Sequence, residues 1–297
     1  MLLGCCVKKK LLLLIFVVLV GGYIAVRPML QVPVEDIARV DLDPAWKTDD
    51  KNAPFVRSLF VTKCHYLGRG KQCEAYETAD NQYVIKLIRQ KPIGLKPKFA
   101  SLPDWFPFLE LKSYIIKDRI ERKRALFQSF LLAYQKIPEQ TGIIFVHLAP
   151  THNMFKPALF IDPFENPMML DLDHAQFVVQ KKAKLLKPMI TAYMENGEIE
   201  KAKLCVDHVF ELLFECIKQG VFDLDTGLIR RDNIGLLEDR AIYIDTGKLR
   251  YMPLKVSKEA FTKDLNRLKP LYRWLLTNYP ELAGYYEIRE KHYINAF

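Results

Sequence analysis

The sequence predicts an α+β protein in which a small antiparallel sheet is followed by a mainly helical part, with an apolar segment in front of both. Short apolar runs bounded by Pro, Asn and Asp turns recur between residues 58 and 180 and are typical of strands. Apolar residues at helical spacing dominate residues 185–219 and return at 261–278. The uncharged run Leu11–Val26 is the third observation. The predicted boundaries are an N-terminal segment of residues 1–30, a tether of residues 31–54, a sheet part of residues 55–180 and a helical part of residues 181–297.

Composition limits the classes of protein to consider. At 297 residues the chain is long enough for one large domain or two lobes with a sizeable core. Half of the residues are hydrophobic and 27% are charged, which is typical of a folded globular protein and not of a disordered one. The net charge of +9 is concentrated in Arg119–Arg124 and Lys181–Lys187, and solvated helix surfaces explain such clusters more often than nucleic acid does. Without a zinc finger, an RNA-binding signature or an arginine-rich tail, no nucleic-acid partner is indicated.

The cysteines do not have the spacing of a disulfide framework. Cys205 and Cys216 lie too far apart along one predicted helix to bond to each other. Cys64 and Cys73 flank a presumed turn and are close enough in sequence to approach, but no metal-ligand spacing accompanies them. We therefore expect free thiols.

The N-terminal segment predicts a membrane anchor. Lys8–Lys10 precede Leu11–Val26, which is short for a spanning helix but lengthens if Pro28–Leu30 contribute. Because no small-x-small cleavage site follows, an uncleaved anchor is favoured over a signal peptide. Three lysines before the run against the lone Arg27 after it place the N-terminus in the cytoplasm. The expectation is a single-pass membrane protein with its globular part on the far side.

The stretch Asp223–Gly247 holds the densest set of candidate site residues. The apolar runs Ile234–Leu237 and Ala241–Ile244 flank a short polar turn, which predicts a tight β-hairpin. Asn233 enters the first strand and Asp245 leaves the second, so strand pairing brings an amide and a carboxylate to the same end of the hairpin. Oxygen ligands on a rigid ribbon suit Mg²⁺, which binds few protein oxygens and keeps the remaining positions for phosphate and water.

A second candidate region contains two glycines and a lysine. Gly68 and Gly70 lie between the strand-like runs Ser58–His65 and Gln82–Ile88, where glycine lets backbone N–H groups approach a phosphate. A lone Gly-x-Gly pair is most often an ordinary hairpin turn. Lys86 follows Tyr-Val-Ile on the next strand, and such a lysine is by itself more often an edge or snorkelling residue.

Taken in order, these residues resemble the protein-kinase-like superfamily. Asn233 and Asp245 resemble the catalytic-loop Asn and the Asp of the Asp-Phe-Gly element, which hold Mg²⁺–ATP. Gly68, Gly70 and Lys86 resemble the Gly-rich loop and the strand lysine that contacts the phosphates. The resemblance implies a bilobal protein-kinase-like fold, with the sheet part as the small lobe, the helical part as a shortened large lobe and a transmembrane helix in front. It also implies ATP and Mg²⁺ as cofactors.

The resemblance further assigns a helix and a connection between the lobes. The helical pattern Leu111–Ile137 would occupy the place of the kinase helix whose Glu pairs with the strand lysine, Lys86. Glu121 is the candidate for that role, with Gln128 as the polar alternative. The segment Val178–Lys182 would connect the lobes with its backbone facing the adenine.

The sequence departs from the family pattern at several positions. Cys73 stands where the third glycine belongs, and no Ala-Pro-Glu follows Asp245. The kinase catalytic base lies five residues before the metal-binding Asn, a register that holds Leu228 here. Asp225, slightly earlier in a longer loop, is the candidate catalytic base, and Asp232 is the other carboxylate in reach.

Three hypotheses follow. The first is a membrane-anchored phosphotransferase that moves the γ-phosphoryl of ATP to an unknown hydroxyl of a protein or small molecule. Lys86 steadies the phosphates, Asn233 and Asp245 hold Mg²⁺, and Asp225 orients the acceptor. The second is a pseudokinase, catalytically weak or dead, that acts as a tethered binding or scaffold module. The third is a basic adaptor that meets anionic lipid through Arg119–Arg124.

Overall fold

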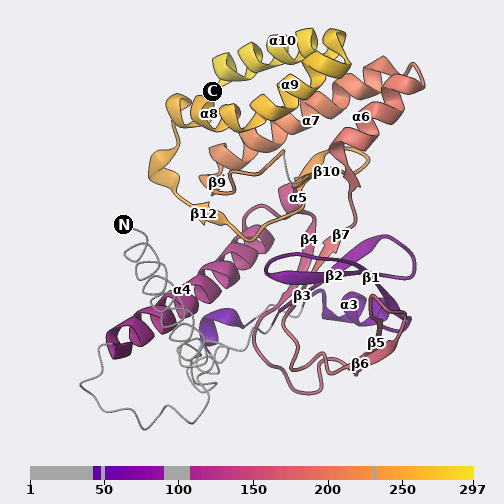
Figure 1. Cartoon of the computed structure of the whole chain (residues 1–297), viewed down its shortest axis with the longest axis vertical. Helices are drawn as coiled ribbons and strands as arrows, with labels where there is room; N and C mark the ends of the chain where they lie inside the picture. Colours follow the sequence, from indigo (N-terminus) through magenta and orange to yellow (C-terminus); the bar gives the residue numbers. More distant parts are fainter. Residues whose placement is uncertain (1–42, 48–50, 90–107, 230–231) are drawn as a thin grey trace, which may run out of the picture. The chain divides into compact units, whose positions relative to one another are not determined.

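The computed structural model describes residues 43–47, 51–89, 108–229 and 232–297 (Figure 1). The chain divides into two compact units, Met1–Asp43 with Gln90–Arg124, and Pro44–Arg89 with Ala125–Phe297. The helix α4 (Phe108–Gln135) contributes its N-terminal half to the first unit and its C-terminal half to the second. All other helices and strands below belong to the second unit.

A seven-stranded sheet forms one part of the second unit, with the strand order β4-β7-β3-β2-β1-β5-β6. Its strands are β1 (Cys64–Arg69), β2 (Cys73–Glu77), β3 (Tyr83–Ile88), β4 (Ile143–His147), β5 (Ala158–Ile161), β6 (Pro167–Leu170) and β7 (Phe177–Lys181). Neighbours are antiparallel except β1 and β5, which are parallel. β7 lies between β3 and β4 and forms hydrogen-bonded ladders with both.

The sheet and the short helix α3 (Ala53–Leu59) share one apolar core. Val56 of α3 packs with Ile85, Phe145 and Phe177 of the sheet, and none of these four residues is exposed. β-Branched and aromatic side chains suit this pleated, buried surface. The core therefore fixes β3, the strand that carries Lys86.

The helices form a second core. They are α5 (Pro138–Thr141), α6 (Leu186–Glu195), α7 (Ile199–Lys218), α8 (Lys258–Leu265), α9 (Lys269–Asn278) and α10 (Pro280–Ala296), with the 3₁₀ turns η1 (Pro44–Trp46), η3 (Pro253–Lys255) and η4 (Asn266–Leu268). α7 is the central helix and packs against α6, α8 and α10 (Figure 1). Its residues Val206, Val209, Phe210 and Leu213 recur at helical spacing and are completely buried.

Short strands around these helices position the candidate site. β11 (Ala241–Tyr243), β10 (Ile234–Leu236) and β8 (Lys184–Leu185) form a three-stranded sheet, and β9 (Val221–Asp223) pairs with β12 (Leu249–Tyr251). A Cβ added to Gly235 would lie 2.6 Å from the Cβ of Ala183. Glycine is therefore needed here because the segment leading into β8 passes so close to β10.

Many predicted elements are confirmed. The strands β4, β5, β6 and β7 fall in the region around residues 58–180 where strands are predicted, α6 and α7 lie within the helical pattern of residues 185–219, and α4 overlaps the predicted helix Leu111–Ile137. The four described cysteines are free thiols, as expected.

The predicted fold class is wrong as stated. The molecule is α+β, but its sheet has seven strands and one parallel pair instead of about five antiparallel strands. Among the residues that the structure describes, no helix is long and apolar enough to cross a membrane, so the transmembrane helix of the predicted fold class is unsupported. The run Leu11–Val26, on which that prediction was based, lies outside the described residues.

Two local predictions are also wrong. Ser58 belongs to the helix α3 and not to a strand, and β1 begins only at Cys64. Val178–Lys182 is paired through β7, and the Lys182 N–H donates to the Gln82 carbonyl, while its role as the connection between lobes stays a prediction. The helix expected over residues 261–278 is interrupted by η4, just before Pro270, and the tail after it folds as α10.

Candidate functional site

The predicted hairpin forms, and it places Asn233 beside the segment that ends in Asp245. Ile234 pairs with Tyr243, and the Leu237 N–H donates to the Arg240 carbonyl at 2.9 Å at the turn. At the opposite end the Ile244 N–H donates to the Asn233 carbonyl at 2.7 Å. The alternating apolar residues and the polar turn therefore determine the register that brings the amide and the carboxylate to one end.

Lys86 reaches this end of the hairpin from the large sheet. Its Nζ donates a hydrogen bond to the carbonyl of Ile244, the residue before Asp245. Part of the residue is exposed, but its ammonium group is enclosed by protein, and this loss of hydration lowers the pKa of Lys86. The negative charge of Asp245 and the neighbouring Cys73 act in the opposite direction.

Asp245 is an exposed carboxylate next to this enclosed ammonium group. Its Oδ1 accepts a hydrogen bond from the Gly247 N–H at 3.1 Å, which holds the side chain in a tight turn. The buried hydroxyl of Ser129 in α4 donates to the Thr246 carbonyl and accepts from the Leu249 N–H at 2.7 Å. One helix side chain thus fixes the backbone on the C-terminal side of Asp245.

Asp225 lies on the other side of Asn233. The Asn233 Nδ2 donates to the Asp225 Oδ2 at 3.0 Å, and the Gly227 N–H donates to Oδ1 at 2.9 Å. Lys248 Nζ lies 3.3 Å from the same Oδ1. Asp225 is 2% exposed, so its carboxylate is held by donors on both oxygens. The sequence predicts Asp225 as a candidate but misses Lys248, because no spacing rule connects a lysine after Asp-Thr-Gly with the earlier loop.

A buried arginine stabilises the loop that carries Asp225. Arg267 in η4 donates to the Asp223 Oδ2, to the Asp264 Oδ1 at 2.9 Å and to the Asp225 backbone carbonyl at 2.8 Å. Burial raises the pKa of Asp223 and of Asp264, and the charge of Arg267 only partly offsets this effect. Sequence analysis misses Arg267 and Asp264, which come from a helical segment remote from the hairpin.

Leu228, at the position where a kinase has its catalytic base, is part of the apolar core. It is 1% exposed, and its carbonyl accepts a hydrogen bond from the Asn233 N–H at 3.0 Å. Its role in this loop is therefore structural.

The two glycines of the second candidate region, Gly68 and Gly70, are not required by the fold. Gly68 lies within β1 opposite Ala75, and a Cβ added there would meet nothing within 4 Å. At Gly70 the nearest atom to an added Cβ would be the Cys73 carbonyl oxygen at 3.5 Å, an ordinary contact. The β1–β2 turn nevertheless lies next to Asp245, since a Cβ on Gly247 would lie 2.5 Å from the Gln72 Oε1.

Gly68→Ala is therefore expected to leave the melting temperature unchanged within about 2 °C, because the new methyl group meets open space. A melting curve without ligand checks this expectation. Gly235→Ala is the contrasting variant, since its methyl group would overlap Ala183 and lower the melting temperature. If Gly68→Ala melted as early as Gly235→Ala, the glycine would have a structural role after all.

Cys73, at the place of the third glycine, contributes no charge at neutral pH. Burial raises the pKa of its thiol to about 11, and the nearby Lys86 lowers it only in part. The thiol is therefore protonated and does not compete with Asp245 for the ammonium group.

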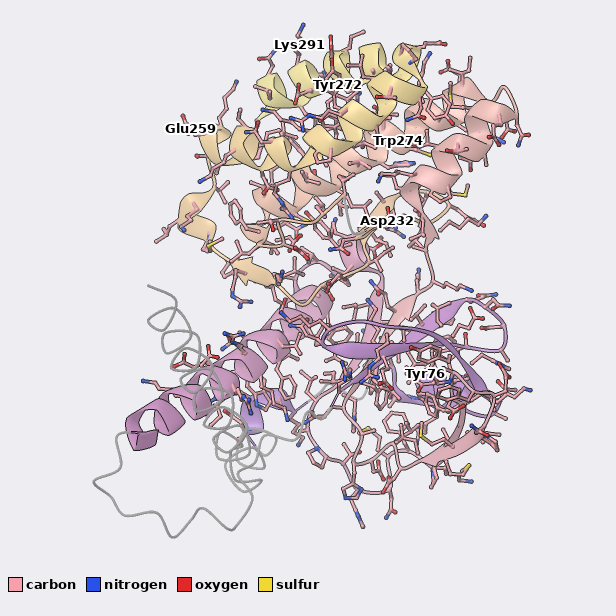
Figure 2. All side chains as sticks on the ribbon, in the orientation of Figure 1. Tyr76, Asp232, Glu259, Tyr272, Trp274 and Lys291 are labelled. Carbon is pink, nitrogen blue, oxygen red and sulfur yellow. The ribbon has the colours of Figure 1, made fainter. Side chains whose placement is uncertain are left out.

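Three other predicted residues lie at exposed positions. Asp232, labelled in Figure 2, is exposed and lies 3.8 Å from the ammonium group of Lys187. Gln128 is exposed on α4. Glu121 is also exposed, and it belongs to the first unit, so its predicted pairing with Lys86 stays a prediction.

The oxygen atoms at the end of the hairpin are of the kind that binds a magnesium ion. Asp245 offers a carboxylate oxygen that none of the hydrogen bonds described here uses, and the hydrogen bond from Asn233 leaves its amide oxygen available. Within the described part of the chain, no group of three or more His, Cys, Asp or Glu side chains could hold a metal ion. Mg²⁺ in proteins is usually held by one or two carboxylates and keeps its other positions for phosphate and water.

A cavity of about 730 Å³ opens beside Asp225. Its walls come from β9, the segment of η3 and α8, and η4, and include Asp223, Asp225 and Arg267. Lys86 and Asp245 are not among its lining residues. Asp225 thus contacts Asn233 at the end of the hairpin and also lines the cavity.

Neither a protein-family model nor a curated protein matches this chain. The combination of one sheet with several helices occurs in many folds and is not diagnostic of the kinase-like superfamily. Functional conclusions therefore depend on the geometry of the site.

Proposed function

We propose that this protein binds ATP with Mg²⁺ at the end of the β10–β11 hairpin and transfers the γ-phosphoryl group to a hydroxyl acceptor. The observation that carries the proposal is the convergence of Lys86 with the segment Ile244–Asp245, which lie on elements far apart in the sequence. Asn233, on the paired strand, connects this point to Asp225. A cation, two oxygen ligands and a buried carboxylate are the groups that phosphoryl transfer requires.

Each residue has a role that follows from its surroundings. The ammonium group of Lys86 is poorly hydrated. It would leave the Ile244 carbonyl and contact the ATP phosphates, because a full negative charge attracts it more strongly than a carbonyl does. Asn233 and Asp245 would hold Mg²⁺, which supplies positive charge against the phosphate oxygens when bound. Asp225 would orient the acceptor hydroxyl and accept its proton as the new P–O bond forms and the bond to ADP breaks.

A pseudokinase-like binding module is the second candidate, and two observations favour it. Leu228 replaces the carboxylate expected at the kinase register, and both Asp225 oxygens already accept hydrogen bonds. This candidate predicts that ATP and Mg²⁺ bind without turnover. Measuring the thermal shift with ATP and Mg²⁺ together with the formation of ADP separates the two functions.

Lys86→Met tests the shared nucleotide site. The affinity for MgATP is expected to fall by about tenfold or more, because a charge-assisted contact is lost. Stability without nucleotide should not fall, since methionine replaces an enclosed ammonium group with an apolar side chain. The measurement is a thermal shift titration, with Lys63→Met, an exposed lysine just before β1, as the control. An equal affinity for MgATP in the wild type and in Lys86→Met would show that Lys86 does not contribute to nucleotide binding.

The same variant predicts a change in pH dependence. Burial lowers the pKa of Lys86 in the folded state below its ordinary value of 10.5, so the unfolded chain binds more protons between the two values. The free energy of unfolding of the wild type should therefore rise with pH across that window, relative to Lys86→Met. Denaturant titrations of both proteins at several alkaline pH values measure this difference, and parallel curves would contradict an enclosed ammonium group.

A further inference from the structure

We propose that the cavity beside Asp225 binds the phosphate acceptor, and that this acceptor is a small amphipathic molecule with a hydroxyl, an apolar body and an anionic group. The acceptor role depends on the proposed phosphotransfer, whereas binding of such a molecule does not. Three features of the cavity carry the inference: its size and apolar lining, its charge balance, and the position of Asp225.

The size and lining of the cavity suit a small molecule. A volume of about 730 Å³ lies inside the range of about 300–1,000 Å³ usual for small-molecule sites. Apolar side chains make up much of its wall, from β9 and the residue after it, the residue before η3, α8 and α9, and they include Phe222, Leu224, Met252, Ala260 and Pro270. Leu224 is 52% exposed and offers apolar surface at the cavity. An apolar ligand body would cover this side chain.

The acidic residues of the cavity already contact basic groups of the protein. Arg267 bridges Asp223 and Asp264 by direct hydrogen bonds. Asp225 accepts a hydrogen bond from Asn233 and lies 3.3 Å from the ammonium group of Lys248. None of the three carboxylates is classed as exposed, so a ligand does not meet them as open negative charges.

The two lysines at the cavity have no such partner. Lys255 and Lys263 both line the cavity and are exposed. Neither has a carboxylate within ion-pair distance among the residues that the structure describes. The exposed charges of the cavity lining are therefore positive, which favours an anion.

Asp225 connects the acceptor cavity with the phosphate donor. It lines the cavity, and through Asn233 it is bonded to the end of the hairpin at which MgATP would bind. Lys248, which is 46% exposed at its side chain, can release the Asp225 Oδ1 to a hydroxyl without unfolding any buried structure. A hydroxyl in the cavity would then give its proton to Asp225 while its oxygen bonds to the γ-phosphorus and the bond from that phosphorus to ADP breaks.

The test uses two matched probes on the full chain. The anionic probe is 8-anilinonaphthalene-1-sulfonate, and N-phenyl-1-naphthylamine has the same ring system without the sulfonate. Fluorescence titrations of the double variant Lys255→Glu/Lys263→Glu should show the affinity for the anionic probe reduced by about tenfold or more. The affinity for the neutral probe should change by less than about twofold. Lys258→Glu, on the helix that carries Lys263 but outside the cavity lining, makes the same type of substitution and is the control that should leave both affinities unchanged.

Several outcomes would overturn the inference. Two results would show that the cavity lysines do not select anions. One is an equal loss of affinity for the anionic probe in Lys258→Glu, and the other is an unchanged affinity for this probe in the double variant. Ala260→Phe narrows the cavity from a half-buried helix position, so undiminished binding of both probes would place them elsewhere. In the wild type, the anionic probe should also suppress the slow hydrolysis of ATP in which water replaces the acceptor. Unchanged hydrolysis with the probe bound would overturn the acceptor role.

The outcomes also separate this inference from the proposed function. If MgATP does not bind but the anionic probe depends on Lys255 and Lys263, the phosphotransfer proposal fails and the anion-binding cavity stands. If MgATP binds and the affinity for the anionic probe does not depend on Lys255 and Lys263, the cavity inference fails and the proposed function stands.

Discussion

Asp245→Asn is expected to lower the rate of ATP-dependent phosphate transfer by about two orders of magnitude or more. Asparagine keeps the shape of the side chain and the hydrogen bond from the Gly247 N–H, but it removes the negative charge that would hold Mg²⁺. It also leaves the enclosed ammonium group of Lys86 without its nearby carboxylate. The measurement is the initial rate of ADP formation at saturating Mg²⁺.

The control comes from the other end of the same hairpin. Asp239 is exposed in the turn, where its carboxylate lies 3.3 Å from Arg240, so Asp239→Asn should retain the full rate. A full rate in Asp245→Asn would exclude Asp245 from the site. Nucleotide binding without turnover in the wild type would instead identify the pseudokinase-like module.

Arg267→Met is expected to lower the free energy of unfolding by about 3–5 kcal/mol, the usual cost of leaving a buried charge without its partner. Arg267 is 16% exposed at its side chain and neutralises both Asp223 and Asp264, which methionine cannot do. Its loss also frees the Asp225 carbonyl and so loosens the loop that carries the candidate base. Urea unfolding followed by circular dichroism measures the change.

The matched control is a second arginine pair. Arg289 contacts Asp207 at 2.6 Å but is more exposed, so Arg289→Met should cost about 1 kcal/mol or less. If the two variants lost the same stability, Arg267 would be an ordinary surface ion pair. Protonation of Asp223 and Asp264 at low pH should also reduce the difference between Arg267→Met and the wild type, because burial raises both pKa values.

Local sequence patterns predicted the β10–β11 hairpin, which is the part of the site formed by neighbouring residues. Alternating apolar residues around a polar turn determine the β10–β11 hairpin, and its register alone places Asn233 beside Ile244. Lys86 is different, because nothing near it in the sequence indicates that it will meet Ile244 and Asp245. Only the resemblance to the kinase order of motifs predicted that contact.

The remaining parts depend on packing between distant segments. Arg267 follows a helix whose pattern indicates an ordinary amphipathic surface, yet it becomes the centre of a buried ion cluster. The interruption of that helix by η4 places the arginine there, and sequence periodicity did not reveal it. The added strands β5 and β6 lie where strands were predicted, but the pairing of β5 with β1 and of β6 with β5 follows from sheet order, which a short run of residues does not encode.

The position of β7 between β3 and β4 has a consequence for how the protein is made. Until Phe177–Lys181 has left the ribosome, β3 and β4 both present an unpaired edge, and the sheet cannot be completed. In the nascent chain, the apolar residues Ile85 and Phe145 are therefore able to associate with other chains until β7 has been translated. Pairing over such long sequence separations is slow, so we expect the sheet to assemble late and to benefit from chaperones during synthesis.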